Sequence, residues 1–263
     1  MRVGHGRSDQ ASDDVAVEAP LEIRLNGSSF AVVMRSPGHD LELSAGFLFA
    51  ERVLRRPDDL GTIRHCTDPD AAHRENVVDV TLTGASALAL DAVLRGSRRV
   101  IASSSCGVCG RQSIDALAAD CEPLPASEAV GDEVIAALPA RLRERQTAFD
   151  QTGGLHAAGL FARDGQLRDV AEDIGRHNAV DKVIGRLVLR DALPARDLAL
   201  FVSGRTSFEI LQKAWLAGVP LVAAVSAPSS LAIELAREAN VTLLGFVRGH
   251  TFNIYSVPAR ITG

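Results

Sequence analysis

The chain has 263 residues and a mass of 27.8 kDa, which is long enough to bury a core without disulfide bonds or a structural metal. Its 33 Asp and Glu residues outnumber 28 Lys and Arg residues, and the formal net charge is −5. This balance argues against a general nucleic-acid-binding protein, which should be basic. A local basic pocket for a phosphorylated ligand remains compatible with it.

The first eighteen residues contain charged side chains and no apolar signal core, so we expect a flexible tail over residues 1–18 and no secretion signal. The uncharged run 214–233 has the length of a membrane span, but Gly218, Pro220 and Pro228 interrupt it. The sequence therefore predicts a cytoplasmic protein with reduced cysteines and no membrane partner.

The first half of the chain predicts a small α+β unit. Apolar and polar residues alternate on both sides of Asn26 and Gly27, a dipeptide that favours a hairpin turn. The expected elements are a hairpin over 21–34, a loop over 36–40, a helix over 41–51, a strand over 77–82 and a helix over 87–94. We assign residues 19–125 to this N-terminal subdomain.

The second half, residues 126–263, alternates apolar runs with helical patterns. The expected strands are 198–202, 221–225 and 241–247, and the expected helices are 208–217, 231–239 and one starting at Asn178. Continuous apolar strands between helices predict a parallel α/β sheet covered on both faces. Earlier in this half, residues 149–161 predict a glycine turn and then a strand, with Gly153 and Gly154 serving packing or binding.

Three loops follow the predicted strands, at 203–207, 226–230 and 248–251. Ligands of open α/β sheets bind beyond the carboxyl ends of strands, and helix N-termini attract anions there. Arg205 and Arg248 add positive charge. A phosphorylated or nucleotide-like ligand is therefore expected, although the serines could be only helix caps and the arginines only solvated surface.

Two of the four cysteines, Cys106 and Cys109, form a C-x-x-C pair in a loop rich in serine and glycine. A thiolate is the reactive form, and its neighbour at this spacing can perturb or resolve it. Dithiol redox chemistry, half of a metal site, and carriage of sulfur as a persulfide all fit the pair. The alternative is two packed structural cysteines, for which such a loop is a poor place.

A zinc deaminase signature is imitated by His73 and Glu75 together with the C-x-x-C pair. The match is weak for two reasons. The deaminase signature has a proline before its first cysteine, and this chain has Ser105 at that position. Residues 74–76 are also typical of a surface turn. A second C-x-x-C motif, which would indicate a structural zinc site, is absent from the sequence.

A polar cluster over 172–177 precedes the amphipathic helix that starts at Asn178. It could hold a ligand or the cysteine loop, with His177 exchanging protons near neutral pH, or it could be an ordinary helix start.

Several segments occur in an order that resembles one known family. They are SPGHD (36–40), EL (42–43), GFL (46–48), SSCGVCG (104–110), TGGLHAA (152–158), GRHNAVDK (175–182), SGRTSFE (203–209) and AVSAPSSLA (224–232). In this order they resemble the FdhD family of sulfur carrier proteins. The resemblance implies a cytidine-deaminase-like three-layer domain, without its zinc chemistry, beside the smaller N-terminal subdomain and a mobile C-x-x-C loop.

The resemblance also implies a function. Cys106 would carry a persulfide received from a cysteine desulfurase, with Cys109 assisting, and would pass the sulfur to the molybdenum cofactor of formate dehydrogenase, a bis(molybdopterin guanine dinucleotide). The residues expected to bind this cofactor are Phe246, Val247, Arg248, Gly249, His250 and Thr251, with Ser203, Gly204, Arg205, Thr206 and Ser226 in the strand-end loops. GDP-like nucleotides could bind there, no metal site or zinc is expected, and the protein would be a homodimer. The alternatives are a zinc-dependent deaminase and a non-catalytic cofactor chaperone.

Overall fold

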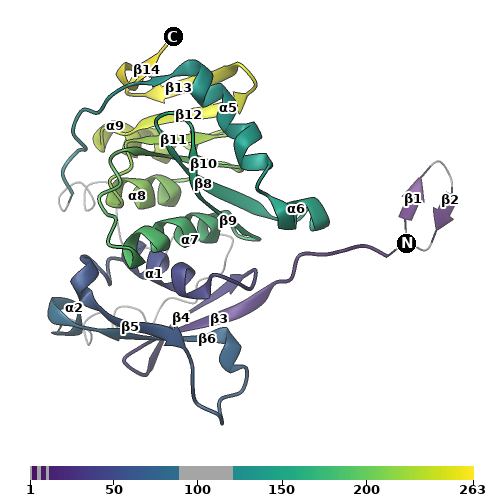
Figure 1. Ribbon diagram of the computed structural model, residues 1–263, viewed down its shortest axis with the longest axis vertical. Coiled ribbons are helices and arrows are strands. Elements are labelled where there is room, and N and C mark those ends of the chain that lie inside the picture. Colours follow the sequence, from purple (N-terminus) through teal and green to yellow (C-terminus); the bar gives the residue numbers. More distant parts are fainter. Residues whose placement is uncertain (1, 5–6, 10–11, 89–120) are drawn as a thin grey trace.

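The computed structural model describes residues 2–4, 7–9, 12–88 and 121–263. Cys106 and Cys109 lie outside the described residues, as does most of the helix expected over 87–94. The described part consists of two stacked units and a short hairpin near the N-terminus (Figure 1). That hairpin, β1 (Arg2–Gly4) and β2 (Arg7–Asp9), was not predicted for the tail.

The N-terminal unit is a four-stranded sheet in the order β4-β3-β6-β5, with α1 packed on it. Asn26 and Gly27 both have positive φ, as the predicted hairpin turn requires. The expected hairpin, first helix and third strand are confirmed. The elements are β3 (Ala19–Leu25), β4 (Ser28–Arg35), α1 (Asp40–Ala50), η1 (Pro57–Asp59), β5 (Leu60–His65), η2 (Arg74–Asn76), β6 (Val77–Leu82) and α2 (Gly84–Leu88).

The C-terminal unit is built on a six-stranded sheet in the order β13-β12-β11-β10-β8-β9. Its helices and strands are β7 (Val130–Gly131), α5 (Asp132–Arg143), α6 (Thr147–Thr152), β8 (His156–Ala162), β9 (Leu167–Asp173), α7 (Arg176–Leu189), β10 (Leu198–Val202), α8 (Phe208–Leu216), β11 (Leu221–Ala224), α9 (Ser230–Glu238), β12 (Thr242–Arg248), β13 (Thr251–Ser256), η3 (Pro258–Arg260) and β14 (Ile261–Thr262). A separate pair joins β14 to β7.

The prediction of a parallel sheet was wrong for half of its strands. The three strands β10, β11 and β12, which helices connect, are parallel as expected. The outer strands β8, β9 and β13 are antiparallel to their neighbours. A short turn joins β12 to β13 and another joins β8 to β9, and a short turn can connect only antiparallel strands.

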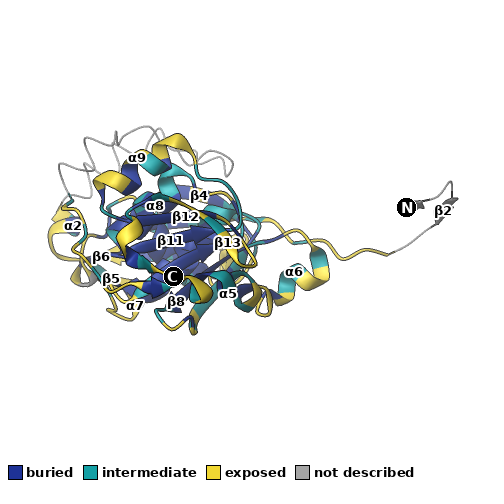
Figure 2. Ribbon diagram, turned by 90° about the horizontal axis from the view of Figure 1, so that it is seen from above, coloured by how far each residue is buried: buried dark blue, intermediate teal, exposed yellow. Residues whose placement is uncertain are grey.

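Helices cover both faces of this sheet, as the apolar strands predicted. α5 packs on one face, while α7, α8 and α9 lie on the other. Within β10, Phe201 belongs to the core under α5, whereas Leu200 and Val202 belong to the core under α7 and α8. The strands β8, β10, β11 and β12 therefore form the buried centre of the unit, whereas exposed residues lie on the surrounding helices and loops and on the edge strand β13 (Figure 2).

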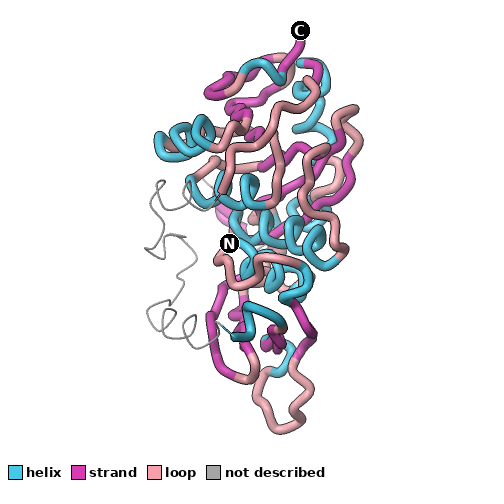
Figure 3. The backbone as a smooth tube through the Cα atoms, turned by 90° about the vertical axis from the view of Figure 1, so that its left-hand side faces the viewer, coloured by secondary structure: helices cyan, strands magenta, loops and turns pink. Residues whose placement is uncertain are grey.

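The two units share one hydrophobic core. α1 of the N-terminal unit packs against α7, so that a layer of helices lies between the two sheets (Figures 1 and 3). The helices approach so closely that a Cβ atom on Gly46 would overlap the carbonyl of Asp181, and one on Gly185 would overlap that of Glu42. The contact therefore depends on glycine at both positions.

The chain returns from outside the described range directly onto the C-terminal unit. The Trp215 indole N–H donates to the Glu122 carbonyl at 3.0 Å, and the Leu124 N–H donates to the Ala239 carbonyl at 2.9 Å. Residues 121–125, which we assigned to the N-terminal subdomain, thus contact the other unit.

No helix in the described ranges is long and apolar enough to cross a membrane. The uncharged run 214–233 is divided among the end of α8, the strand β11 and the start of α9.

Candidate functional site

Two of the predicted strand-end loops lie side by side. The Thr206 N–H donates to the Ala227 carbonyl at 3.3 Å, and the Ser229 N–H donates to the Thr206 carbonyl at 3.0 Å. Thr206 also forms an isolated parallel bridge with Pro228. Loops 203–207 and 226–230 therefore form one continuous edge beyond β10 and β11.

The third predicted segment adjoins this edge at one end. The Phe246 N–H donates to the Ser226 carbonyl at 3.2 Å, and Phe246 is exposed. Arg248 is exposed too, with its guanidinium carbon 6.0 Å from the centre of the Phe246 ring. Val247 alternates with them and is fully buried in the core under α5, so its side chain faces away from this surface.

The remaining predicted residues lie in or beside these loops. Gly249, His250 and Thr251 are exposed at the turn between β12 and β13. Ser203 ties β10 to the start of β8, because its hydroxyl accepts from the Ala157 N–H at 2.8 Å. The antiparallel neighbour β8 thus brings its first residues to the same edge of the sheet.

The alternative that these serines are only helix caps holds for one helix. The Ser229 hydroxyl accepts from the Ala232 N–H at 3.2 Å and caps α9. Ser207 precedes α8 but caps nothing with its side chain, and Gly175 precedes α7 without a side chain to offer. No N-cap side chain therefore occupies the first N–H groups of α7 in the described part of the chain, whereas at the start of α8 the Glu209 carboxylate accepts from its own backbone N–H.

The Ser207 hydroxyl instead meets a histidine from the neighbouring helix. It lies 2.8 Å from Nε2 of His177, and Oε2 of Glu209 lies 3.6 Å from the same nitrogen. Hydrogen bonding from His177 is the main cause that lowers the pKa of Glu209 to about 2. Both partners share one ring nitrogen, which differs from a Ser-His-Asp triad, where the acid binds the other nitrogen.

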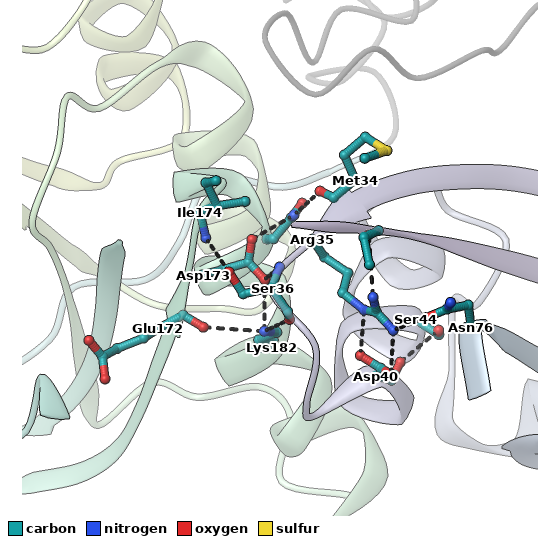
Figure 4. Close-up of polar contacts among 12 residues, drawn as sticks. Met34, Arg35, Ser36, Asp40, Ser44, Asn76, Glu172, Asp173, Ile174 and Lys182 are labelled. Atoms are coloured by element: carbon teal, nitrogen blue, oxygen red, sulfur yellow. Dashed lines mark hydrogen bonds and ion pairs between the residues drawn. The ribbon is translucent and has the colours of Figure 1, made fainter. Parts of the chain in front are cut away.

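The polar cluster before α7 is anchored by a buried carboxylate (Figure 4). Asp173 is fully buried; it lies 2.7 Å from the ammonium of Lys182 and accepts from the N–H of Gly175 and the amide of Asn178. The Ser36 N–H donates to the same carboxylate at 3.2 Å, and the Lys182 ammonium donates to the Ser36 carbonyl at 3.1 Å. These residues join the two units and fix where α7 begins.

A second buried ion pair, between Arg35 and Asp40, lies at the two ends of the segment that contains Ser36. Arg35, with 1% of its side chain exposed, binds both carboxylate oxygens of Asp40 at 2.9 Å and donates to Asn76 at 3.0 Å (Figure 4). The segment 36–40 is thus used to join the units. In contrast, Arg176 and His177 start α7 beside loop 203–207.

The two residues of the deaminase-like signature that the structure describes lie elsewhere. His73 and Glu75 are exposed on a short turn of the N-terminal unit, 3.5 Å apart. Among the described residues, no group of three or more His, Cys, Asp or Glu side chains is placed to hold a metal. Cys66 is buried beside β6, and Cys121 lies 3.4 Å from a guanidinium nitrogen of Arg52.

The structure adds residues that were not predicted at this edge. His156, Arg176 and Glu209 come from the starts of β8, α7 and α8, next to loop 203–207. Arg176 and His156 stand in segments that the sequence had singled out, but their convergence depends on β8 pairing with β10. A Cβ atom on Gly204 would lie 3.3 Å from the His156 ring and 3.5 Å from Arg176 Cδ, so glycine here lets both approach the loop.

A family model and individual known proteins both match this chain along nearly its whole length. Residues 16–262 match the model of the FdhD/NarQ family. A sulfur carrier protein FdhD from Streptomyces avermitilis is 46% identical, over 99% of this chain and 93% of its own. Another from Anaeromyxobacter dehalogenans is 49% identical, over 95% of this chain and 88% of its own.

A solved structure supports the fold. The crystal structure of a protein from Desulfotalea psychrophila, described as a formate dehydrogenase accessory protein, superposes on this chain with a TM-score of 0.73. The sequences are 26% identical, and the match covers 95% of this chain and 91% of the other. From the sequence match along nearly its whole length and this shared mixed α/β architecture, the chain belongs to the FdhD/NarQ family.

Proposed function

We propose that the chain is a sulfur carrier that serves the maturation of a formate dehydrogenase. The observation that carries this proposal is the match to proteins named as sulfur carriers, at 46–49% identity along nearly the whole chain. A cysteine that could carry the sulfur is present as Cys106, with Cys109 near it in the sequence. The resemblance of the C-terminal unit to cytidine deaminases, and assembly as a homodimer, are parts of the same proposal.

Sulfur would be loaded by thiol–persulfide exchange. The Cys106 thiolate attacks the terminal sulfur of a persulfide on a cysteine desulfurase. A new S–S bond forms at Cys106, the old S–S bond breaks, and the desulfurase cysteine leaves as a thiolate. Cys109, three residues further on, would assist or relay this sulfur.

The acceptor would be the molybdenum of a bis(molybdopterin guanine dinucleotide), bound as cargo. The sulfur leaves Cys106, which returns to a thiolate, and the metal supplies the two electrons that turn the transferred sulfur into sulfide. Loops 203–207 and 226–230 and the exposed residues around Arg248 would hold the nucleotide arms. The uncapped start of α7 and the guanidinium groups at this edge suit the phosphates of such a ligand.

Intact-protein mass spectrometry tests the loading step. The full chain is incubated with a cysteine desulfurase, pyridoxal phosphate and L-cysteine, and a gain of one sulfur atom that a thiol reductant removes is expected. Cys106→Ala should abolish the gain, whereas Cys66→Ala should keep it, because Cys66 is buried in the N-terminal unit. A Cys106→Ala chain that still gained sulfur, or still supported full formate dehydrogenase maturation, would contradict the proposal.

A further inference from the structure

Two charge pairs connect α7 with α8, one helical turn apart. The first lies at the start of both helices, where Oε2 of Glu209 is 3.6 Å from Nε2 of His177. The second joins the Lys213 ammonium to the Asp181 carboxylate at 2.5 Å. In each helix the two residues are four positions apart, so the second pair follows the first along the same helix faces.

The second pair is buried more deeply than the first. The side chains of Asp181 and Lys213 are 3% and 9% exposed, against 14% for both His177 and Glu209. Burial raises the pKa of Asp181, while Lys213 and His177 act in the opposite direction. A neutral acid would leave the buried Lys213 ammonium without the carboxylate that it contacts, so the ionised pair satisfies both groups best.

The four groups alternate in sign along and across the two helices. Asp181 lies one turn from His177 along α7, and Lys213 lies one turn from Glu209 along α8. His177 is among the causes that lower the pKa of Asp181, so the two groups attract each other when both are charged. Such an interaction is reciprocal, and Asp181 therefore favours the protonated form of His177 by the same free energy.

His177 also meets groups from other elements at the edge of the sheet. Its Nε2 lies 2.8 Å from the Ser207 hydroxyl. Burial, and then Arg176, His177 and Arg205, lower the pKa of His156 in β8. Positive groups therefore crowd this edge, and a protonated His177 needs nearby carboxylates to offset their repulsion.

Two further carboxylates face the deeper pair. Burial raises the pKa of Glu51, which follows α1, and Lys213 opposes this rise. Asp173, at the end of β9, is among the groups that raise the pKa of Asp181. The charges of the Asp181–Lys213 pair therefore act within a cluster to which α1, α7, α8 and β9 all contribute.

We propose that Asp181 and Lys213 are positioning residues of the site, which hold the His177 and Glu209 side chains in one orientation and one arrangement of charge. Stability alone does not require such a pair, because apolar side chains of similar volume can replace a buried ion pair at little or no cost. Its place one turn behind the first pair gives it a role at the site instead. The inference rests on the proposed function only for the ligand that His177 meets.

The titration of His177 tests the proposal in the ligand-free full chain. NMR of 15N-labelled histidine rings follows each ring with pH, and the signal that His177→Gln removes identifies the ring. Asp181→Asn should lower the pH at which His177 loses its proton by at least about half a unit, because it removes an anion and leaves Lys213. Arg186→Met is the matched control, since it removes an ion pair with Asp169 further along α7 and should leave that pH unchanged.

The double substitution Asp181→Leu with Lys213→Met separates charge from packing. It should unfold within about 5 °C of wild type, because an apolar pair replaces an ionic one. It should still lower the pH at which His177 loses its proton, and it should support formate dehydrogenase maturation about tenfold less well, because small misplacements at a site cost rate. Asp181→Asn alone decides the question if the double variant does not fold.

The proposal is overturned if Asp181→Asn leaves the His177 titration unchanged, if Arg186→Met shifts it equally, or if the folded double variant supports full maturation. The titrations need neither ligand nor sulfur, whereas sulfur loading of the wild-type chain tests the proposed function. A shifted titration without sulfur loading removes the proposed function alone. Sulfur loading without a shifted titration removes the positioning role alone.

Discussion

Glu209 shows how one contact at the site links stability to pH. Its pKa, about 2 in the folded chain, lies below the ordinary value of 4.5, chiefly because His177 donates a hydrogen bond to it. A carboxylate with a lowered folded pKa stabilises the folded chain above its unfolded pKa. That contribution is therefore fully present above about pH 4.5 and is lost as the pH falls toward 2.

Glu209→Gln should accordingly destabilise the chain more at neutral than at acidic pH. We expect a loss of about 1 kcal/mol at pH 7, since part of the carboxylate faces water and screening reduces the effect of the shift. Urea unfolding at pH 7 and near pH 3 measures both differences, with the exposed Glu238→Gln as control. An equal loss at both pH values would show that the interaction with His177 is not electrostatic.

The sequence identified most residues at the edge of the sheet but not what each one does there. Ser207 and Ser229 both precede helices, but Ser229 caps its helix whereas the Ser207 hydroxyl contacts His177 instead, a difference that only the folded chain reveals. Val247 is different, because the alternation of exposed and buried residues along a strand could have placed it inward between Phe246 and Arg248.

The close contact between α1 and α7 leaves no room for a side chain at Gly46 or Gly185. Gly46→Ala and Gly185→Ala each place a methyl group inside a backbone carbonyl of the facing helix. The helices must separate, so each variant should lose several kcal/mol of unfolding free energy, on the order of 3 kcal/mol or more. Thermal or urea unfolding of the purified variants measures the loss.

Gly131→Ala is a suitable control for both, because its Cβ atom would meet only a Val134 methyl at 4.0 Å. It should change stability by less than about 1 kcal/mol. Wild-type stability in either α1 or α7 variant would mean that the two helices do not approach each other as closely as described.

Elements with strong patterns were predicted from the sequence, and those whose pattern is broken were not. α7, α8 and α9 have clear apolar stripes between glycine or proline signals. α5 buries Ile135, Leu138 and Leu142 at helical spacing, but Pro139 within it disguises the helix. The strand directions of β8, β9 and β13 could not be predicted from apolar runs, since these runs say which residues are buried and not which strands pair.

The contacts of Ser36 with Asp173 and Lys182, which join the two units, could not be predicted either. Ser36 and Lys182 lie far apart in the sequence, one in a predicted loop and the other in a predicted amphipathic helix. Only the folded chain shows that the Asp173 carboxylate accepts a hydrogen bond from the Ser36 N–H and pairs with the Lys182 ammonium.

At the scale of the whole molecule, one core should produce one unfolding transition. Trp215, the only tryptophan, reports on the C-terminal unit, and amide hydrogen exchange in β3 and β6 reports on the N-terminal sheet. Because α1, α7 and both sheets contribute to a single hydrophobic cluster, both signals should change at the same urea concentration. Loss of protection in β3 and β6 at a clearly lower concentration would indicate two independently stable units.

The shared layer of helices also affects how the protein is made. The ribosome completes the N-terminal sheet and α1 when Leu82 emerges, but the helix that covers them, α7, is complete only at Leu189. Until then, the side of α1 that packs against α7 in the folded protein has no native partner. Exposed apolar surface of this kind is what chaperones hold and what aggregation recruits. The nascent chain should therefore be most vulnerable during the synthesis of the residues between these two points.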